Sequence, residues 1–394
     1  MKYVIIIPDG AADEPLSELA GKTPLEAALT PAMDEVASTG QIGTAATVPE
    51  GFESGSDVAT MSLLGYDPAV YHTGRAPLEA AAQNIPLKSS DWVFRCNLVT
   101  TRDGRMIDHS CGGISNAEAR HLLADLAKSI QYPGAQFYPG VSYRNLLVFR
   151  GDDHFEVKTF PPHEIPDQPL ADHLPTGTGN DQLLSFMKQS ERLFDHHPVN
   201  VARRAKGQNS ATQIWLWGQG HPPAIPSFKE KFGVAKGAMI TGVDLLRGIA
   251  SLLGWSSIES PGMTSFHDTD YAAQGRTTCD AIDKFDIVVS HIEAPDEASH
   301  QADFKTKIAS IEAIDQHVVG PVLKKLRTVG DYRLMVLPDH PTNIATRKHG
   351  RAPTLYAMTG KNLSPSRLRY SEADARKGLR FDKGHDLMNA FLKT

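Results

Sequence analysis

Seven side chains are of the types that bind divalent metal ions or attack phosphorus, and each lies where an apolar segment ends or a helical segment begins. They are Asp9, Ser56, Asp296, His300, Asp339, His340 and His349. Six are the aspartate and histidine ligands that borderline divalent metals favour, and Ser56 carries a hydroxyl that can act as a nucleophile. If one fold gathers them, the result is a two-metal centre for phosphoryl transfer.

The spacing within this set supports metal binding. Asp296 and His300 are four residues apart, so on a helix they lie on one face and can hold one ion, although a capping Asp followed by an exposed His is the ordinary alternative. Asp339 and His340 stand between two prolines directly after an apolar run, and His349 follows nine residues later. Each pattern alone also fits an ordinary loop, so the prediction depends on their combination.

Ser56 is the sharpest single candidate because it precedes a short predicted helix over residues 57–64. A serine at this place is commonly an N-cap. The same position puts the oxygen at the positive end of the helix dipole, beside free backbone N–H groups that can stabilise an alkoxide and then a covalent phosphate. Ser54, in the same loop, is the competing nucleophile.

Short apolar strands alternate with helical segments at both ends of the chain, which predicts an α/β fold with functional groups beyond the carboxyl ends of the strands. We expect strands over residues 3–7, 41–47, 286–290, 333–337 and 354–358, a loop over 291–295 and a helix over 303–326. Residues 75–222 contain none of the seven groups. We interpret them as a domain inserted into a metal-binding domain made of residues 1–74 and 223–394.

Composition limits the class of protein. A net charge of −6 over 394 residues argues against a nucleic-acid surface, and no Walker A or GxGxxG motif is present. Cys96, Cys111 and Cys279 form no CxxC pair, so neither a disulfide framework nor a thiolate zinc site is expected, as is typical of a reducing cytosol. No apolar run approaches the roughly 20 residues of a membrane span. We therefore expect a cytoplasmic protein that binds neither nucleic acid nor a membrane.

A small anionic substrate needs only a few basic groups in a cleft. The candidates are Arg75, Arg144, Arg203, Arg204 and Lys236. Guanidinium groups match the geometry of carboxylate and phosphate oxygens, but each candidate is equally well a solvated surface charge. Asp108 and His109 could transfer a proton or orient a substrate, with an ordinary loop pair as the alternative.

Together these motifs resemble the 2,3-bisphosphoglycerate-independent phosphoglycerate mutases, in particular the archaeal-type branch of the alkaline phosphatase superfamily. The resemblance covers nearly the whole chain. Its segments are Pro8-Asp9-Gly10, residues 55–59, 62–68, 73–80 and 293–300, Asp339-His340 and His349. It implies an α/β fold with an alkaline-phosphatase-like three-layer metal domain and a smaller inserted α/β domain that binds substrate.

The resemblance also implies a site and a reaction. One metal site is implied at Asp296, His300 and His349, a second at Asp9, Asp339, His340 and Ser56, and substrate-binding residues at Arg75, Asp108, His109, Arg144 and Lys236. The two ions are expected to be Mn²⁺ or Zn²⁺, with Mg²⁺ or Co²⁺ as alternatives. Ser56 is expected to take the phosphoryl group of 3-phosphoglycerate, a small phosphorylated acid, and return it to the 2-hydroxyl of the retained glycerate. This is an isomerase reaction of glycolysis and gluconeogenesis.

A related metal-dependent phosphotransferase or phosphatase, such as a proposed homoserine kinase, is the alternative, because it would use the same ligand set.

Overall fold

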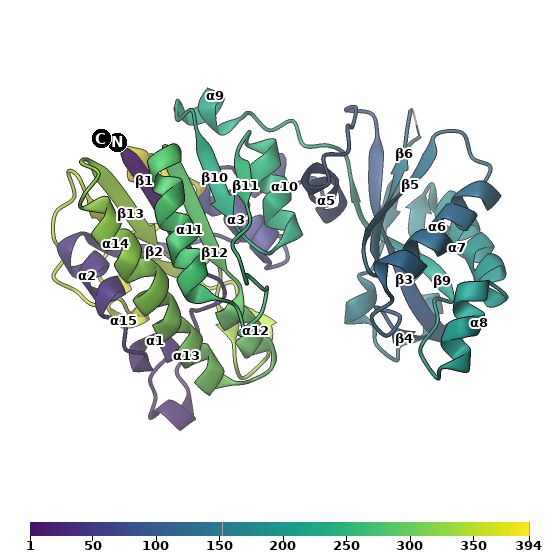
Figure 1. Cartoon of the computed structure of the whole chain (residues 1–394), viewed down its shortest axis with the longest axis horizontal. Helices are drawn as coiled ribbons and strands as arrows, with labels where there is room; N and C mark the ends of the chain where they lie inside the picture. The colour runs from purple at the N-terminus through teal and green to yellow at the C-terminus, as the bar shows by residue number, and fades with distance from the viewer. Residues whose placement is uncertain (152, 394) are drawn as a thin grey trace. The chain divides into compact units, whose positions relative to one another are not determined.

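The structure is a computed structural model that describes residues 1–151 and 153–393, and it divides into two compact units (Figure 1). The first unit consists of Met1–His72 and Ile225–Thr394, and the second of Thr73–Ala224. The first unit therefore contains both ends of the chain, and the second is one uninterrupted segment. The boundaries expected from the sequence, after residues 74 and 222, lie two residues from these divisions.

An eight-stranded sheet forms the centre of the first unit, in the order β11-β10-β12-β1-β13-β16-β2-β17. The strands are β1 (Lys2–Pro8), β2 (Gln41–Ala45), β10 (Gly237–Ile240), β11 (Ser256–Ile258), β12 (Ile287–Ile292), β13 (Tyr332–Val336), β16 (Thr354–Gly360) and β17 (Leu379–Phe381). The five strands from β11 to β13 are parallel, whereas β16 runs antiparallel to both of its neighbours. A two-residue antiparallel pair, β14 (Thr342–Asn343) and β15 (Lys348–His349), stands apart from this sheet.

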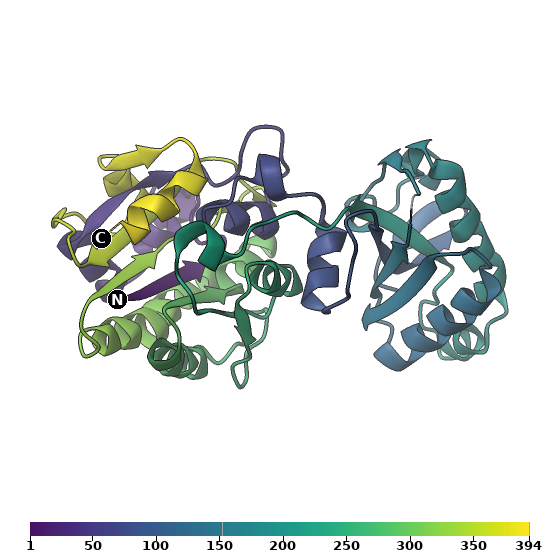
Figure 2. The same cartoon turned by 90° about the horizontal axis from the view of Figure 1, so that it is seen from above.

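Helices cover both faces of this sheet (Figures 1 and 2). They are α1 (Pro24–Ala27), α2 (Pro31–Thr39), α3 (Ser56–Leu63), α4 (Pro68–Tyr71), α9 (Phe228–Phe232), α10 (Asp244–Leu252), α11 (Tyr271–Lys284), α12 (Ala294–His300), α13 (Phe304–Ile314), α14 (Gly320–Leu326), α15 (Glu372–Ala375) and α16 (Leu387–Leu392). Successive side chains of a strand point to opposite faces. Val4 and Ile6 accordingly belong to one apolar cluster with α2, α11, α13 and α14, whereas the ring of Tyr3 packs against Phe391 of α16. The predicted three-layer α/β arrangement is confirmed.

The helix expected over residues 303–326 contains an irregularity that the sequence pattern did not predict. Asp315–Val319 forms a π-helical turn between α13 and α14. Pro321 has no N–H to donate to the carbonyl of His317, which favours a widened turn at this point. A Cβ on Gly275 would lie only 1.9 Å from the oxygen of His317, so α11 packs directly against this carbonyl.

The prediction of a loop over residues 291–295 is wrong. Strand β12 continues through His291 and Ile292, because its parallel pairing with β1 extends to the pair Pro8 and Ile292. Helix α12 then begins at Ala294. His291 is therefore a buried strand residue and not part of a connecting loop.

The second unit is built on a five-stranded antiparallel sheet. Its main elements are α5 (Arg75–Ala82), β3 (Trp92–Arg102), β4 (Arg105–Asp108), α6 (Asn116–Ser129), β5 (Ala135–Val141), β6 (Arg144–Phe149), α7 (Asn180–Asp195), α8 (Pro198–Ala205) and β9 (Gln213–Gly220), with a small β7 (Glu156–Lys158) and β8 (Thr176–Thr178) pair. Phe94 and Cys96 of β3 face the cluster that includes α6 and α7, whereas Val93 packs with α5 on the other face. Among the described residues of both units, no helix is long and apolar enough to cross a membrane.

A buried ion pair joins the two loops that follow β1 and β13. The ammonium group of Lys307 on α13 lies 2.8 Å from Asp13 Oδ2 and 2.7 Å from the carbonyl oxygen of Thr342. Asp13 Oδ2 also accepts the backbone N–H of Ile344. All of these groups are buried, so one cation neutralises a carboxylate and holds both loops against the helix.

Replacing Lys307 by alanine should lower the free energy of unfolding of the first unit by roughly 3–5 kcal/mol, because it leaves the buried carboxylate of Asp13 without its partner. Calorimetry of the purified chain would measure the loss. Lys305→Ala on the exposed side of the same helix is the matched control and should change stability by less than about 0.5 kcal/mol. Equal effects of the two substitutions would contradict this account of the ion pair.

Candidate metal centre

Three neighbouring parallel strands bring the predicted ligands to one edge of the large sheet. Asp9 follows β1, Asp339 follows β13, and Asp296 lies in the first turn of α12, which begins just after β12. The order β12-β1-β13 makes these strands adjacent, and parallel strands end at the same edge. Gly10 has φ 61°, and a Cβ there would lie 2.6 Å from Asp296 Oδ1, so only glycine fits directly after Asp9.

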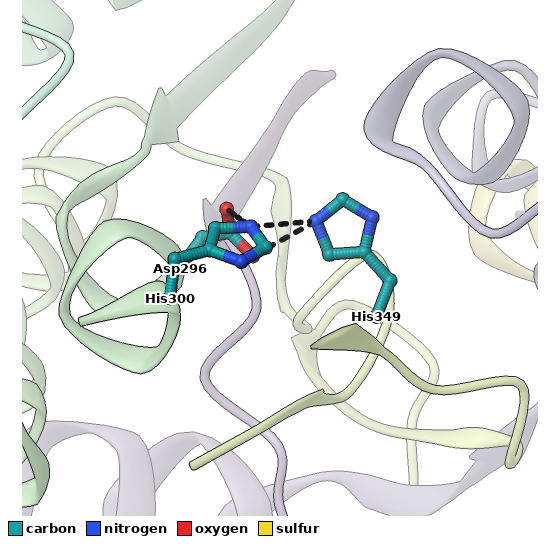
Figure 3. Close-up of side chains that lie close together, drawn as sticks. All are labelled: Asp296, His300 and His349. Atoms are coloured by element: carbon teal, nitrogen blue, oxygen red, sulfur yellow. Dashed lines mark hydrogen bonds and ion pairs between the residues drawn. The ribbon is translucent and has the colours of Figure 1, made fainter. Parts of the chain in front are cut away.

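The first ligand group contains Asp296, His300 and His349, whose ligand atoms all lie within 4.8 Å of one another. Figure 3 shows Asp296 and His300 projecting from α12 toward His349, which reaches them from the opposite side. His300 Nε2 lies 3.0 Å from Asp296 Oδ2 and 3.0 Å from His349 Nε2. The i, i+4 spacing therefore places one carboxylate and one imidazole on a common helix face, as the sequence predicted.

The second ligand group contains Asp9, Asp339 and His340, all completely buried. His340 Nε2 lies 3.5 Å from Asp339 Oδ2 and 3.8 Å from Asp9 Oδ1. Within the described residues neither of these two carboxylate oxygens has a hydrogen-bond partner. Buried carboxylate oxygens without partners are costly, and a divalent cation is the partner that this set of donors fits.

Ser56 lies beside the second ligand group. Its Oγ donates to Asp9 Oδ2 at 3.0 Å and lies 3.4 Å from His340 Nε2. Ser56 is the first residue of α3, with Gly55 at the N-cap and no side chain capping the helix. The hydroxyl expected to cap the helix is therefore turned toward the carboxylate, while it remains at the positive end of the helix.

Ser54 is engaged elsewhere in the same region. Its hydroxyl donates to the carbonyl of Gly350 at 2.7 Å, and its own carbonyl oxygen lies 3.0 Å from His349 Nδ1. The structure thus brings Ser56, and not Ser54, into contact with the second ligand group.

The hydrogen bonds of His300 and His349 turn the same ring nitrogen toward Asp296. His300 Nδ1 lies 2.9 Å from the carbonyl of Arg347, and His349 Nδ1 lies 3.0 Å from that of Ser54. A carbonyl only accepts, so each Nδ1 carries the hydrogen. In both rings Nε2 then faces Asp296, and an ion bound there would take the place of the hydrogen that Nε2 shares with its neighbours.

His340 follows the same rule through a hydroxyl. Thr342 donates its hydroxyl hydrogen to Asp296 Oδ1 at 2.6 Å, so its oxygen can only accept from His340 Nδ1, 3.2 Å away. His340 Nε2 is therefore free on the side of Asp9 and Ser56.

The excess of carboxylates in this small volume shifts their pKa values. Burial, and next the charge of Asp9, raises the pKa of Asp339 to about 7. Burial and the same charge raise the pKa of Glu293 well above its usual range. Burial also acts to raise the pKa of Asp296, but hydrogen bonds from His300 and His349 outweigh it and lower that pKa well below its ordinary value. Ions bound here would remove the repulsion that burial intensifies.

Sequence reasoning missed a third set of neighbouring groups, formed by Asp9, His291 and Glu293. His291 Nε2 lies 2.7 Å from Asp9 Oδ2 and 3.6 Å from Glu293 Oε2. The available signal was the polar pair His291 and Glu293 at the end of an apolar run just before Asp296. Because residues 291–295 were expected to form a loop, this pair was not singled out.

In the second unit, five basic side chains form a cluster that we call the basic cluster. They are Arg75, Arg95, His109, Arg144 and His163. Arg75 and Arg95 both flank Gly218, since a Cβ there would lie 3.8 Å from Arg75 Cβ and 3.3 Å from Arg95 Cδ. The guanidinium of Arg144 lies 5.7 Å from the ring of Tyr143.

The two histidines of the basic cluster lie beside the arginines. The ring of His109 is 6.1 Å from that of His163, which in turn is 5.3 Å from Trp217. Burial, and next the charges of Arg75 and Arg95, lowers the pKa of His163 to about 4.

Arg95, which the sequence did not single out, is the buried centre of this cluster. Its guanidinium lies 2.9 Å from Glu79 Oε1 and stacks over Trp217 at 4.2 Å, while its Nε has no hydrogen-bond partner among the described residues. Burial lowers the pKa of Arg95, and the positive charges of Arg75 and Arg144 lower it further. The charge of Glu79 raises this pKa but does not outweigh burial. The carboxylate of Glu79 neutralises part of the charge of Arg95, and guanidinium groups such as those of the basic cluster suit an anion.

Asp108 is engaged by its own loop. Its carboxylate accepts from both the backbone and the hydroxyl of Ser110, from the backbone of Gly112 and from the amide of Asn209. Burial opposes these bonds, but together they lower the pKa of Asp108 to about 2. Asp108 therefore shapes the loop that carries His109.

Three other predicted anion-binding residues have different surroundings. Arg203 donates to Asn209 O, Glu118 and Cys111 O within its own unit, and Arg204 donates to the carbonyl of Asp195. Lys236 directly precedes β10, at the amino ends of the parallel strands and so at the opposite edge of the sheet from the metal ligands. The structure does not bring Lys236 to the metal centre.

Comparisons with known proteins agree with this geometry. The family model for 2,3-bisphosphoglycerate-independent phosphoglycerate mutase matches residues 37–200. The enzyme of that name from Methanothrix thermoacetophila is 44% identical over 395 residues, covering 100% of both chains, and the probable enzyme from Geobacter sulfurreducens is 42% identical, again over 100% of both.

Two solved structures are also similar over nearly their whole length. The PH0037 protein from Pyrococcus horikoshii has a TM-score of 0.83 with 27% identity, covering 99% of this chain and 96% of its own. The cofactor-independent phosphoglycerate mutase from Thermoplasma acidophilum has a TM-score of 0.66 with 24% identity, covering 100% and 99%, and shares the fold.

The raised pKa of Asp339 predicts that the free energy of unfolding of the metal-free chain depends on pH. Its ordinary value is 3.8 and its folded value about 7, so the folded state holds this proton more tightly and loses stability as pH rises between these values. Asp339→Asn should therefore stabilise the chelator-treated protein at pH 8 by a few kcal/mol, because each pKa unit corresponds to about 1.4 kcal/mol. Urea unfolding at pH 5 and pH 8 measures the free energy of unfolding of both proteins. The difference between variant and parent should be smaller at pH 5 than at pH 8. A difference that is the same at both pH values would contradict the assignment.

Proposed function

This chain belongs to the 2,3-bisphosphoglycerate-independent phosphoglycerate mutases, and we propose that it interconverts 3-phosphoglycerate and 2-phosphoglycerate through a phosphoserine formed on Ser56. The observation that carries the proposal is the contact of the Ser56 hydroxyl with Asp9 and His340 at the N-terminus of α3. Relatives over 40% identical along the full chain carry the mutase name, which favours this reaction over the phosphotransferase or phosphatase alternative, including homoserine phosphorylation.

In this proposal Ser56 is the nucleophile in two displacement steps. In the first, a bond forms between its Oγ and phosphorus while the bond from phosphorus to the 3-oxygen of the substrate breaks. In the second, the 2-hydroxyl of the same glycerate takes the phosphoryl group back, so substrate and product are isomers and no water is consumed. The backbone N–H groups in the first turn of α3 lie at the positive end of the helix, where they can stabilise the negative phosphoserine.

We propose that the two ligand groups each hold one divalent ion. Asp296, His300 and His349 would bind one, and the second group with Ser56 would bind the other. Aspartate and imidazole ligands without thiolate favour Mn²⁺ or Zn²⁺, with Mg²⁺ or Co²⁺ as alternatives. Bound ions would supply charge that lowers the pKa of the Ser56 hydroxyl and neutralises phosphoryl oxygens.

The basic cluster of the second unit is proposed to bind the anionic groups of the substrate. Arg95 is held by Glu79 and Trp217, so its guanidinium is pre-ordered and little side-chain entropy is lost on binding. Arg75 and Arg144 add positive charge that is suited to a carboxylate or phosphate. His109 and His163 are the additional donors.

The test is production of 2-phosphoglycerate from 3-phosphoglycerate by the purified chain with Mn²⁺ and without added 2,3-bisphosphoglycerate, measured by coupling to enolase. Ser56→Ala should reduce turnover by at least about 10³-fold, because it removes the nucleophile, while both ions still bind. The control is Ser54→Ala, which removes the neighbouring hydroxyl and should retain turnover within about tenfold. Turnover that survives loss of Ser56 but not of Ser54 would reject the assignment.

Removing the charge of Arg95 should weaken substrate binding more than it slows the chemical step. Since Arg95→Gln alone would remove the cation that lies 2.9 Å from the buried Glu79 carboxylate, the substitution is made together with Glu79→Gln. KM for 3-phosphoglycerate is expected to rise about 10–100-fold, the usual value of a charged hydrogen bond. Arg192→Gln on the exposed surface of the same unit is the control and should leave KM unchanged. An unchanged KM in the double variant would remove Arg95 from the proposed site.

A further inference from the structure

His291 is a fourth histidine at the metal centre and has no role in the proposed reaction. It lies in β12, fully buried, in register with Ile7 two residues before Asp9. Gln274 on α11, also buried, donates to the carbonyl of His291 at 2.9 Å and so fixes this end of the strand. An imidazole in such a place must satisfy both of its ring nitrogens within the protein.

The hydrogen-bond pattern of His291 is the reverse of that in His300, His340 and His349. In those three rings Nδ1 faces a group that can only accept, which leaves Nε2 for an ion. In His291, Nδ1 instead faces the hydroxyl of Thr241, which can donate, and Nε2 lies 2.7 Å from Asp9 Oδ2. Nitrogen and carboxylate oxygen at this separation require a hydrogen between them, because two acceptors would repel each other.

Thr241 accounts for the other nitrogen. The Oγ of Thr241 already accepts the backbone N–H of Val243 at 3.1 Å, and it lies 3.2 Å from His291 Nδ1. The hydroxyl can therefore direct its own hydrogen to Nδ1, which leaves the single hydrogen of a neutral ring on Nε2. The two hydrogen bonds from Thr241 to His291 and from His291 to Asp9 thus use both ring nitrogens of His291 without an ion.

This series of hydrogen bonds determines the orientation of the Asp9 carboxylate. Asp9 Oδ2 receives both His291 and Ser56, whereas Asp9 Oδ1 has no hydrogen-bond partner among the described residues and is the oxygen on the side of His340. Once Ser56 carries a phosphoryl group it can no longer donate to Oδ2. His291 is then the donor that still holds the carboxylate in place.

We infer that His291 is a positioning residue: set by Thr241, it donates from Nε2 to Asp9 and orients the free oxygen of that carboxylate toward the second ligand group. The inference rests on the proposed function, because it assigns Asp9 to an ion. It also decides whether the set Asp9, His291 and Glu293 binds a third cation or serves to orient Asp9. A nitrogen that donates a hydrogen cannot at the same time bind a third cation.

Metal titration of the whole chain tests this with a readout that does not depend on turnover. By calorimetry with Zn²⁺ the parent protein should bind two ions. His291→Ala should still bind two, with one dissociation constant raised about 10–100-fold, as is usual when the partner of a metal ligand is lost. His291→Gln should bind nearly as the parent does, because its amide nitrogen can replace Nε2 as the donor. Thr241→Val should weaken the same ion by a smaller factor, and Thr241→Ser should restore it.

Three ions bound by the parent and two by His291→Ala would overturn the inference in favour of a third cation site. Unchanged dissociation constants in His291→Ala would overturn it as well.

A measurement on the unaltered chain avoids any loss of folding in the variants. Two-bond ¹H–¹⁵N correlation spectra of the Zn²⁺-loaded protein should show His291, identified by its absence in His291→Gln, with its hydrogen on Nε2. The three ligand histidines should carry theirs on Nδ1. A hydrogen on Nδ1 of His291 would reject the inference. Failure of the proposed reaction is a separate result, because it appears as a parent protein that binds two ions and yet forms no 2-phosphoglycerate.

Discussion

The crowding of carboxyl groups at one edge of the large sheet is the constraint on which the rest of the first unit depends. Asp9, Asp296 and Asp339 are buried within a few ångströms of the imidazoles, and Glu293 adds a fourth carboxyl. Burial, and next the repulsion by the charge of Asp9, raises the pKa values of two of them, Asp339 and Glu293. A fold that tolerates this arrangement must hold it rigidly, and it gains from cations that offset the charge.

The rigidity comes from polar groups that surround the ligands. Thr342 contacts Asp296 and His340 at once, and the backbone oxygens of Arg347 and Ser54 orient the other two imidazoles. The pair of Lys307 and Asp13 holds the loops after β1 and β13 against α13. Each ligand is therefore oriented before an ion binds, so binding does not have to order the site.

The two units present opposite charge. The first concentrates carboxylates that suit cations, and the second concentrates guanidinium and imidazole groups around Arg95 and Trp217 that suit anions. A small phosphorylated acid carries two kinds of anionic group, a phosphate and a carboxylate. In the proposed reaction, the cations would neutralise the phosphoryl group that is transferred, and the guanidinium groups are proposed to bind the part of the molecule that is retained.

The sequence by itself determined the α/β class, and it predicted Ser56 with six aspartate and histidine ligands and an inserted segment over residues 75–222. It could do so because strand ends, an i, i+4 pair and a glycine-flanked helix start are local patterns. Only the tertiary structure decided that Lys236 lies at the opposite edge of the sheet, that Arg95 is the buried arginine and that His291 meets Asp9. Those facts depend on strand order, register and the hydrogen-bond partners of each ring nitrogen. Such contacts join residues up to 282 positions apart, so a local pattern in the chain does not show which groups meet.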